Sequence, residues 1–211
     1  AGPQGPVGPE GPTGIIASLN TIFSGEYRSG CSHIESLVDD TCQLNIPLGF
    51  TFNGFGASVS SVSVSSNGVL FFGGNCSTQF SNTALPSGLS SNPALFFFWD
   101  DLFDFGGGEY VEYATFGSAP GRVFYLYFRN RLLSSVCGSE AVQAMISIHE
   151  GSNLVTTTYY PSTPGCAAIR GSAATLGIQG SNGASAVLVG FNVPLLDDNA
   201  NRQSMTFRPP N

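Results

Sequence analysis

The sequence predicts an all-β fold, an antiparallel β-sandwich of jelly-roll type, from three observations. Hydrophobic residues make up 42% of the chain, and 17 Phe and 7 Tyr supply bulky side chains for a core. Short β-type runs are separated by turn residues such as Asn67-Gly68 and Pro120-Gly121. No convincing helix lies between these runs, so we expect no helical crossovers and antiparallel pairing throughout.

Eleven runs are short and bounded by turn residues, which is typical of strands. They are residues 46–52, 59–65, 69–72, 94–100, 110–116, 122–130, 142–149, 154–160, 174–179, 186–191 and 204–207. The alternation in Val62-Ser63-Val64 predicts one buried face and one wet face. The run Leu95-Phe96-Phe97-Phe98-Trp99 is apolar on both faces, which predicts a central strand with Trp99 in the core. Residues 123–128 are also bulky on both faces, so two sheets, or a sheet and a neighbouring subunit, must cover them.

The first residues follow a tripeptide rhythm that is typical of a collagen-like triple helix. Glycine recurs at Gly2, Gly5, Gly8, Gly11 and Gly14, with Pro after each of the first four. Only Gly fits at the crowded axis of such a helix, so the tract predicts a homotrimer. The alternative is a flexible Pro/Gly-rich linker. Because the chain begins inside the repeat, we expect a longer stalk and an export signal upstream.

The predicted domain organisation is a stalk over residues 1–14 and a β-sandwich head over residues 15–211. Residues 15–23 at the start of the head form a neck, because Ile15, Leu19 and Ile22 have helix-like spacing. Four triplets are too few to hold three chains together, since the ordering entropy of each chain opposes assembly. We therefore expect the head to supply the contacts that hold the trimer.

The charge balance limits the choice of partners. All 7 basic residues are Arg, against 14 acidic residues, for a net charge of -7. Nucleic acid is an unsuitable partner because binding phosphates needs clustered Lys and Arg, and an anionic membrane surface is disfavoured for the same reason. No run reaches the roughly 20 apolar residues of a membrane-spanning helix, so we expect no membrane insertion.

Five cysteines in a Ser/Thr/Gly-rich chain indicate an oxidising compartment. Cys137 and Cys166 are equally distant from a predicted hairpin turn, which would place them opposite each other and predicts a disulfide. Cys31 and Cys42 bracket a short polar loop and are predicted to pair, which leaves Cys76 free. The alternative is that Cys76 pairs with one of the first two cysteines, Cys31 or Cys42.

The densest acidic cluster, Asp100, Asp101 and Asp104, follows the predicted central strand. Ca²⁺ takes six to eight oxygen ligands, so this loop is a candidate metal site, with residues 197–201 as a second oxygen-rich loop. The spacing matches no EF-hand, and Asp at a strand end commonly caps backbone N–H groups. No cofactor is firmly indicated, and Ca²⁺ is the one possible ion.

Catalysis is not expected. The two histidines, His33 and His149, are far apart in the sequence, and no recognised nucleophile, phosphate-binding or metal-binding motif accompanies them. No pair of facing carboxylates can be identified for glycoside hydrolysis. Aromatic rings can stack on sugars, and the candidates for this role are near strand ends: Tyr110, Tyr113, Tyr159 and Tyr160.

Several segments resemble a β-sandwich module that recurs in exported bacterial proteins. They are residues 46–52, 64–72, 98–102, 146–153 and 174–179. Together with the Gly-X-Y tract, the chain is similar to collagen-stalked trimeric fibre proteins, including the tips of adhesive fibres on predatory bacteria. This resemblance implies an extracellular or cell-surface location and an adhesive role.

The leading functional hypothesis is therefore a homotrimeric fibre tip that binds a cell-surface ligand, either a glycan or another envelope component. Three copies would turn weak single-site binding into useful avidity. The alternative is a structural cap that registers the collagen-like rod and has no ligand of its own.

Overall fold

The computed structural model describes residues 31–34, 37–103, 110–132, 141–160, 166–196 and 202–210. The chain divides into two compact units, Ala1–Cys31 and Ser32–Asn211. The predicted stalk, residues 1–14, and neck, residues 15–23, lie outside the described residues and stay predictions. We refer to Ser32–Asn211 as the sandwich unit, because it holds the strands described below.

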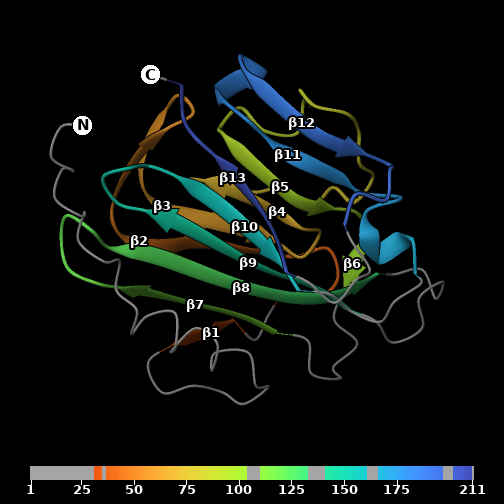
Figure 1. Ribbon diagram of the computed structural model, residues 1–211, viewed down its shortest axis with the longest axis horizontal. Helices are drawn as coiled ribbons and strands as arrows, with labels where there is room; N and C mark the ends of the chain where they lie inside the picture. Colours follow the sequence, from red (N-terminus) through yellow and green to blue (C-terminus); the bar gives the residue numbers. More distant parts are fainter. Residues whose placement is uncertain are drawn as a thin grey trace, which may run out of the picture. The chain divides into compact units, whose positions relative to one another are not determined.

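The sandwich unit consists of two antiparallel sheets, which Figure 1 shows as two layers. The first sheet has the order β1-β7-β8-β9-β10-β13, with β6 pairing to β8. Its strands are β1 (Ser32–Ile34), β6 (Leu102–Phe103), β7 (Tyr110–Phe116), β8 (Val123–Leu132), β9 (Ala141–His149), β10 (Val155–Tyr159) and β13 (Gln203–Phe207). The second sheet has the order β12-β11-β5-β4-β3-β2. Its strands are β2 (Cys42–Gly54), β3 (Ala57–Ser65), β4 (Val69–Phe72), β5 (Ala94–Trp99), β11 (Thr175–Gln179) and β12 (Ala186–Phe191).

The predicted all-β class and antiparallel pairing are confirmed, and each of the eleven predicted runs coincides with a strand. Two strands were not predicted, β1 and β6, because runs of 3 and 2 residues are too short to show alternation. In the second sheet most paired strands are consecutive in the chain, and in the first sheet the four strands β7 to β10 are, as in a meander. This arrangement differs from the paired Greek keys of a jelly roll, because short hairpin turns keep consecutive strands in one sheet.

The main core lies between the two sheets and is rich in phenylalanine. Phe52 and Phe72 stack with ring centroids 4.8 Å apart, and Phe97 of the second sheet meets Phe128 of the first edge-on at 4.9 Å. All four side chains are fully buried. Burying a side chain of this kind stabilises the fold by about 1.5 to 3 kcal/mol, so this cluster is a major source of stability.

A second apolar cluster lies on the other face of β4 and β5, where Phe71, Phe96 and Trp99 are buried together with Leu85. Leu85 belongs to the long connection between β4 and β5, residues 73–93, which covers this face. The indole Nε1 of Trp99 donates a hydrogen bond of 2.7 Å to a carbonyl oxygen of the same connection. The prediction that Trp99 packs in the core is confirmed, and the second cover of β5 is a loop of its own chain.

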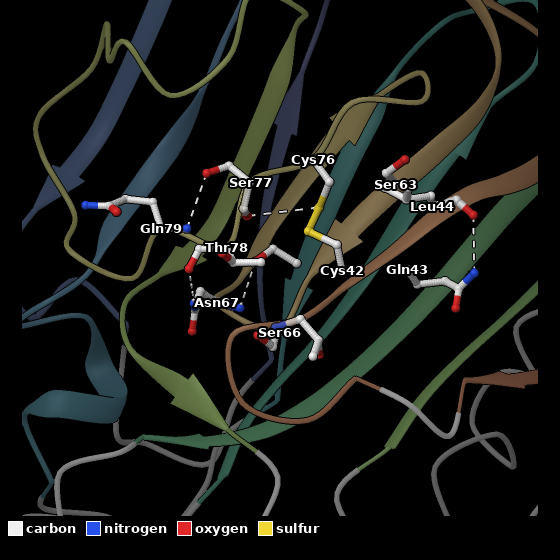
Figure 2. The surroundings of a disulfide bond; sticks show 12 residues. Cys42, Gln43, Leu44, Ser63, Ser66, Asn67, Cys76, Ser77, Thr78 and Gln79 are labelled. Carbon is white, nitrogen blue, oxygen red and sulfur yellow. Dashed lines mark hydrogen bonds between the residues drawn. A yellow bond between two sulfur atoms is a disulfide. The ribbon is translucent and has the colours of Figure 1, made fainter.

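A disulfide joins Cys42, the first residue of β2, to Cys76 in the 73–93 connection, with a Cα–Cα distance of 6.3 Å (Figure 2). The predicted Cys31–Cys42 pair is therefore wrong, and so is the prediction that Cys76 is free. The short spacing of Cys31 and Cys42 did not predict the pairing, because the 73–93 connection folds back toward β2 and β3 and brings Cys76 to Cys42. Cys166 is also disulfide-bonded. Its predicted partner, Cys137, lies outside the described residues, so that pairing stays a prediction.

The Asn67-Gly68 turn shows why these residue types are needed there. Gly68 has a φ of 73°, and a Cβ at this position would lie 1.9 Å from the carbonyl oxygen of Phe98. The Asn67 side chain is fully buried, and its oxygen accepts a hydrogen bond of 2.9 Å from the backbone N–H of Leu102. The turn therefore closes a hairpin and also positions the chain after β5.

Candidate functional site

The structure separates the predicted ligand-binding tyrosines. Tyr159 is 4% exposed, and its hydroxyl donates to the carbonyl oxygen of Phe97 across the core. Tyr113 packs against the core beside Phe124, with ring centroids 6.2 Å apart. Tyr159 is therefore a core residue, and its predicted role in ligand contact is wrong. Tyr110 begins β7, and its side chain lies outside the described residues.

Tyr160 follows Tyr159 and therefore lies on the opposite, outward face of the first sheet. Its backbone N–H donates to the carbonyl oxygen of Gln143 at 3.0 Å, which continues the pairing of β10 with β9. Tyr127, Met145, Thr158 and Ser204 are cross-strand neighbours on this face. We call this surface the Tyr160 face and define it by Gln143, Thr156, Thr158, Tyr160, Arg202, Ser204 and Thr206. Tyr127 is only 5% exposed and packs against the Tyr160 ring.

The aromatic end of the Tyr160 face is well defined. The rings of Tyr127 and Tyr160 meet edge-on with centroids 6.2 Å apart, and the guanidinium of Arg202 lies over the Tyr160 ring at 4.9 Å. The Tyr127 hydroxyl donates to the Gln143 side-chain oxygen at 3.0 Å. Burial raises the pKa of Tyr160 to about 12, against a smaller opposing effect of Arg202, so its phenol is neutral at physiological pH. The Tyr160 hydroxyl donates to Sδ of Met145 at 3.9 Å, and its oxygen can still accept a hydrogen bond.

The other end of the Tyr160 face is a ladder of hydroxyl groups between β10 and β13. The hydroxyls of Thr158 and Ser204 are 2.8 Å apart, and those of Thr156 and Thr206 are 2.9 Å apart. Ser204 and Thr206 are exposed. Each hydroxyl keeps a further lone pair or proton after this pairing, so the ladder can hydrogen-bond to a ligand.

The alternation of residues in the sequence is a signal that could have predicted this surface. In β8, Tyr125 and Tyr127 alternate with Phe124, Leu126 and Phe128. Only the second set joins the main core between the sheets, although Tyr127 is also buried, at 5% exposed. Residues 155–159 and 203–207 alternate in the same way. The period of two therefore places tyrosines and hydroxyls on one side, but only the strand order brings β8, β9, β10 and β13 together.

The structure brings together a different set of carboxylates from the predicted metal residues Asp100, Asp101 and Asp104. The carboxylate oxygens of Asp39, Asp40 and Asp101 lie within 4.8 Å of one another and form an acidic group that could hold a cation such as Ca²⁺. Asp100 is not part of this group, because its carboxylate accepts the Asp101 backbone N–H at 2.9 Å, as in a strand-end cap. Asp104 and residues 197–201 of the second predicted loop lie outside the described residues, so their predicted roles stay predictions.

The acidic group has a distinct electrostatic environment. Burial, followed by the charges of Asp40 and Asp39, raises the pKa of Asp101. Asp40 accepts a hydrogen bond of 2.8 Å from the Asn67 side-chain amide, which ties the group to the buried Asn67-Gly68 turn. Sequence reasoning missed Asp39 and Asp40 because they are about sixty residues from Asp101 in the chain, and only the fold brings them together.

A serine and a histidine also lie together on β9. The Ser147 hydroxyl is 3.3 Å from Nε2 of His149, and burial lowers the pKa of His149, so its ring is neutral at pH 7. Nucleophilic catalysis of the Ser-His type usually has a third group that orients the imidazole. Among the described residues, no carboxylate is hydrogen-bonded to His149. The geometry therefore defines a polar strand surface and not an assembled triad.

The fold and its surfaces define a class: a two-sheet, disulfide-containing β-sandwich with a polar and aromatic outer face. Residues 20–210 match the family described as NIDO related, so the chain belongs to the NIDO-related family. This family's domain is an extracellular-type module, and the disulfide fits that location. In the described part of the chain, no helix is both long and apolar enough to span a membrane. No curated protein and no solved structure matches the chain.

Proposed function

We propose that the sandwich unit is the binding head of a homotrimeric, collagen-stalked extracellular fibre, and that its Tyr160 face contacts a glycan or envelope component on another cell. The observation that carries the proposal is the chemistry of this face. A partly exposed tyrosine ring with an overlying arginine lies beside a ladder of hydroxyls. Sugars present apolar C–H faces that pack on aromatic rings, and hydroxyls that pair with Ser, Thr and Arg side chains.

The fibre part of the proposal is supported by the Gly-X-Y tract, which serves a three-chain helix. Three heads on one stalk would present three copies of the Tyr160 face to one cell surface. Linked sites raise avidity by factors of roughly 10² to 10⁴ over a single site. A weak contact at each head is therefore sufficient for adhesion. The proposed role is binding without catalysis and requires no cofactor.

The proposal is tested by measuring binding of the full chain to a glycan array and to intact bacterial cells. Tyr160→Ala should lower the apparent affinity at least tenfold, because it removes the stacking platform and the group over which Arg202 lies. The matched control is Phe80→Ala, since Phe80 is a partly exposed aromatic residue, 44% exposed, outside the Tyr160 face. Equal binding by wild type, Tyr160→Ala and Arg202→Ala would contradict the assignment of the site.

A second candidate function is a structural cap that holds three chains in register. One observation favours it, namely a row of exposed apolar side chains on β12, the edge strand of the second sheet. If the sandwich unit is only a cap, deleting it abolishes fibre assembly, whereas Tyr160→Ala leaves adhesion unchanged. The two functions are compatible, because they use different sheets.

A further inference from the structure

The exposed apolar side chains of the described residues are concentrated in one place. Nine large hydrophobic side chains are exposed, and six of them lie on β12 and the segment that follows it. We call this surface the β12 strip and define it by Val187 (55% exposed), Leu188 (42%), Val189 (38%), Phe191 (37%), Val193 (42%) and Leu195 (39%). The other three are scattered in the sequence at Val38, Leu44 and Phe80.

The β12 strip presents apolar groups on both faces of the sheet. Val187 pairs with Ile178, which points into the main core, and Phe191 pairs with Thr175, whose hydroxyl bonds to the 73–93 connection on the outer face. Paired residues share a face, so Val187 lies on the core side of the sheet and Phe191 on the outer side. Both side chains are more than a third exposed, so neither the opposite sheet nor the 73–93 connection covers this strand. Among the described strands, β12 pairs only with β11, which leaves its other backbone edge open.

An edge of this kind is unusual for a protein that stays monomeric. Exposed edge strands normally carry charged residues that block pairing with another chain, and contiguous apolar patches normally mark interaction sites. Residues 186–196 contain no charged residue, and the single proline, Pro194, follows the strand. The β12 strip therefore lacks the usual protection and has the composition of an interface core.

We propose that the β12 strip is the contact through which three copies of this chain associate, with the three strips facing one another around the threefold axis. This inference rests on the trimer of the proposed function and assigns its interface. As a collagen-like triple helix, the Gly-X-Y tract would join three parallel chains, and its four triplets are too short to hold them together. The remaining contacts must come from the folded part of the chain.

Charge and complementarity identify a second copy as the occupant. Each chain has a net charge of -7, so copies repel one another, and contact through an uncharged surface avoids adding close like-charge pairs to this repulsion. The β12 strip is uncharged, whereas the acidic group of Asp39, Asp40 and Asp101 would be unfavourable at such a contact. The other exposed apolar residues are scattered, so the surface that best matches one strip is the strip of a neighbouring copy.

The test is the mass of the full chain in solution, measured by light scattering coupled to size-exclusion chromatography over a range of concentrations. The double variant Leu188→Glu/Phe191→Glu places charge in the β12 strip. Its matched control, Leu44→Glu/Phe80→Glu, changes the same residue types at similar exposure, 46% and 44%, outside the strip. We expect wild type and control at three times the chain mass of 22.0 kDa and the strip variant at one chain mass.

The outcomes separate this inference from the proposed function. A trimeric strip variant would overturn the assigned interface and leave the trimer intact. A wild-type chain that is monomeric at all concentrations would overturn the trimer, and a dimer would indicate twofold pairing of β12 edges instead of threefold contact. Far-UV circular dichroism establishes whether the strip variant is folded. If it is not, Leu188→Cys with a short bismaleimide linker gives a second readout: efficient crosslinking between chains supports the interface, and its absence contradicts it.

Discussion

Removing the Cys42–Cys76 disulfide should destabilise the sandwich unit by an amount that its loop length predicts. The two cysteines are 34 residues apart. In the chain-entropy account, closing a loop of this length lowers the entropy of the unfolded chain by about 12 to 13 cal/mol/K, which corresponds to about 3.8 kcal/mol at 25 °C. The folded state should change little, because Leu85 and the hydrogen bond from Trp99 still hold the 73–93 connection in place.

The assay is equilibrium unfolding in guanidinium chloride of wild type and the double variant Cys42→Ser/Cys76→Ser. A variant is preferable to a reducing agent, because a reductant would also break the disulfide of Cys166. We expect the free energy of unfolding to fall by about 3 to 4 kcal/mol and the m value to rise, since the unfolded chain can expand further. Each single variant should lose as much as the double variant, because either one removes the whole crosslink. Unchanged stability, or single effects that add up to the double effect, would refute the reasoning.

Three further predictions concern buried polar groups near the acidic group and the second apolar cluster. Asn67→Ala should lower the free energy of unfolding by about 2 to 3 kcal/mol, because the buried N–H of Leu102 loses its acceptor. Asn67→Asp keeps that acceptor but should cost at least as much, because it loses the amide donor to Asp40 and buries a carboxylate beside the Asp40 carboxylate. Trp99→Phe should lower it by about 2 kcal/mol, since the hydrogen bond to Gln79 and part of the buried ring are lost, and thermal unfolding followed by circular dichroism measures this. Burial raises the pKa of Asp100 to about 6, so the folded state binds its proton more tightly than the unfolded chain does. The contribution of Asp100 to stability should therefore rise as the pH falls from 7 toward 4, and Asp100→Asn should remove this contribution. The stability of the variant relative to wild type should then decrease over this range, and a difference that does not change with pH would contradict the assignment.

The proposed function and the proposed interface use different parts of the sandwich unit. The Tyr160 face belongs to the first sheet, around β8, β9, β10 and β13, whereas the β12 strip is the edge of the second sheet. Figure 1 shows β12 in the second layer, beside β11, and away from β8 and β9. A trimer formed through the β12 strip would thus leave the Tyr160 face of each copy available to a ligand. Binding and assembly can then be disrupted separately by mutation.

Local patterns in the sequence were sufficient to identify eleven of the thirteen described strands, but not the short strands β1 and β6. Period-two alternation and turn residues depend only on neighbours in the chain, and β4, β7 and β12 have the bounds that these patterns predict. The all-apolar run that became β5 was also correctly assigned to the centre of a sheet. The predicted stalk depends on an equally local pattern, the glycine at every third position of residues 1–14.

Contacts between distant segments could not be predicted in this way. Tyr159 and Tyr160 are adjacent and chemically identical, yet one lies in the core and the other on the surface, because the register of β10 decides which face each occupies. Likewise, Cys42 finds Cys76 only because the 73–93 connection folds back over β4 and β5.

The sequence by itself determined eleven of the thirteen described strands and the composition of the core, since these follow from short-range periodicity and apolar content. The tertiary structure alone decided the strand order, the disulfide partner of Cys42, the assembly of Asp39, Asp40 and Asp101, and the exposure of β12. The physical reason is that these features depend on which strands pair and which surfaces remain uncovered, and both result from packing across the whole sandwich unit.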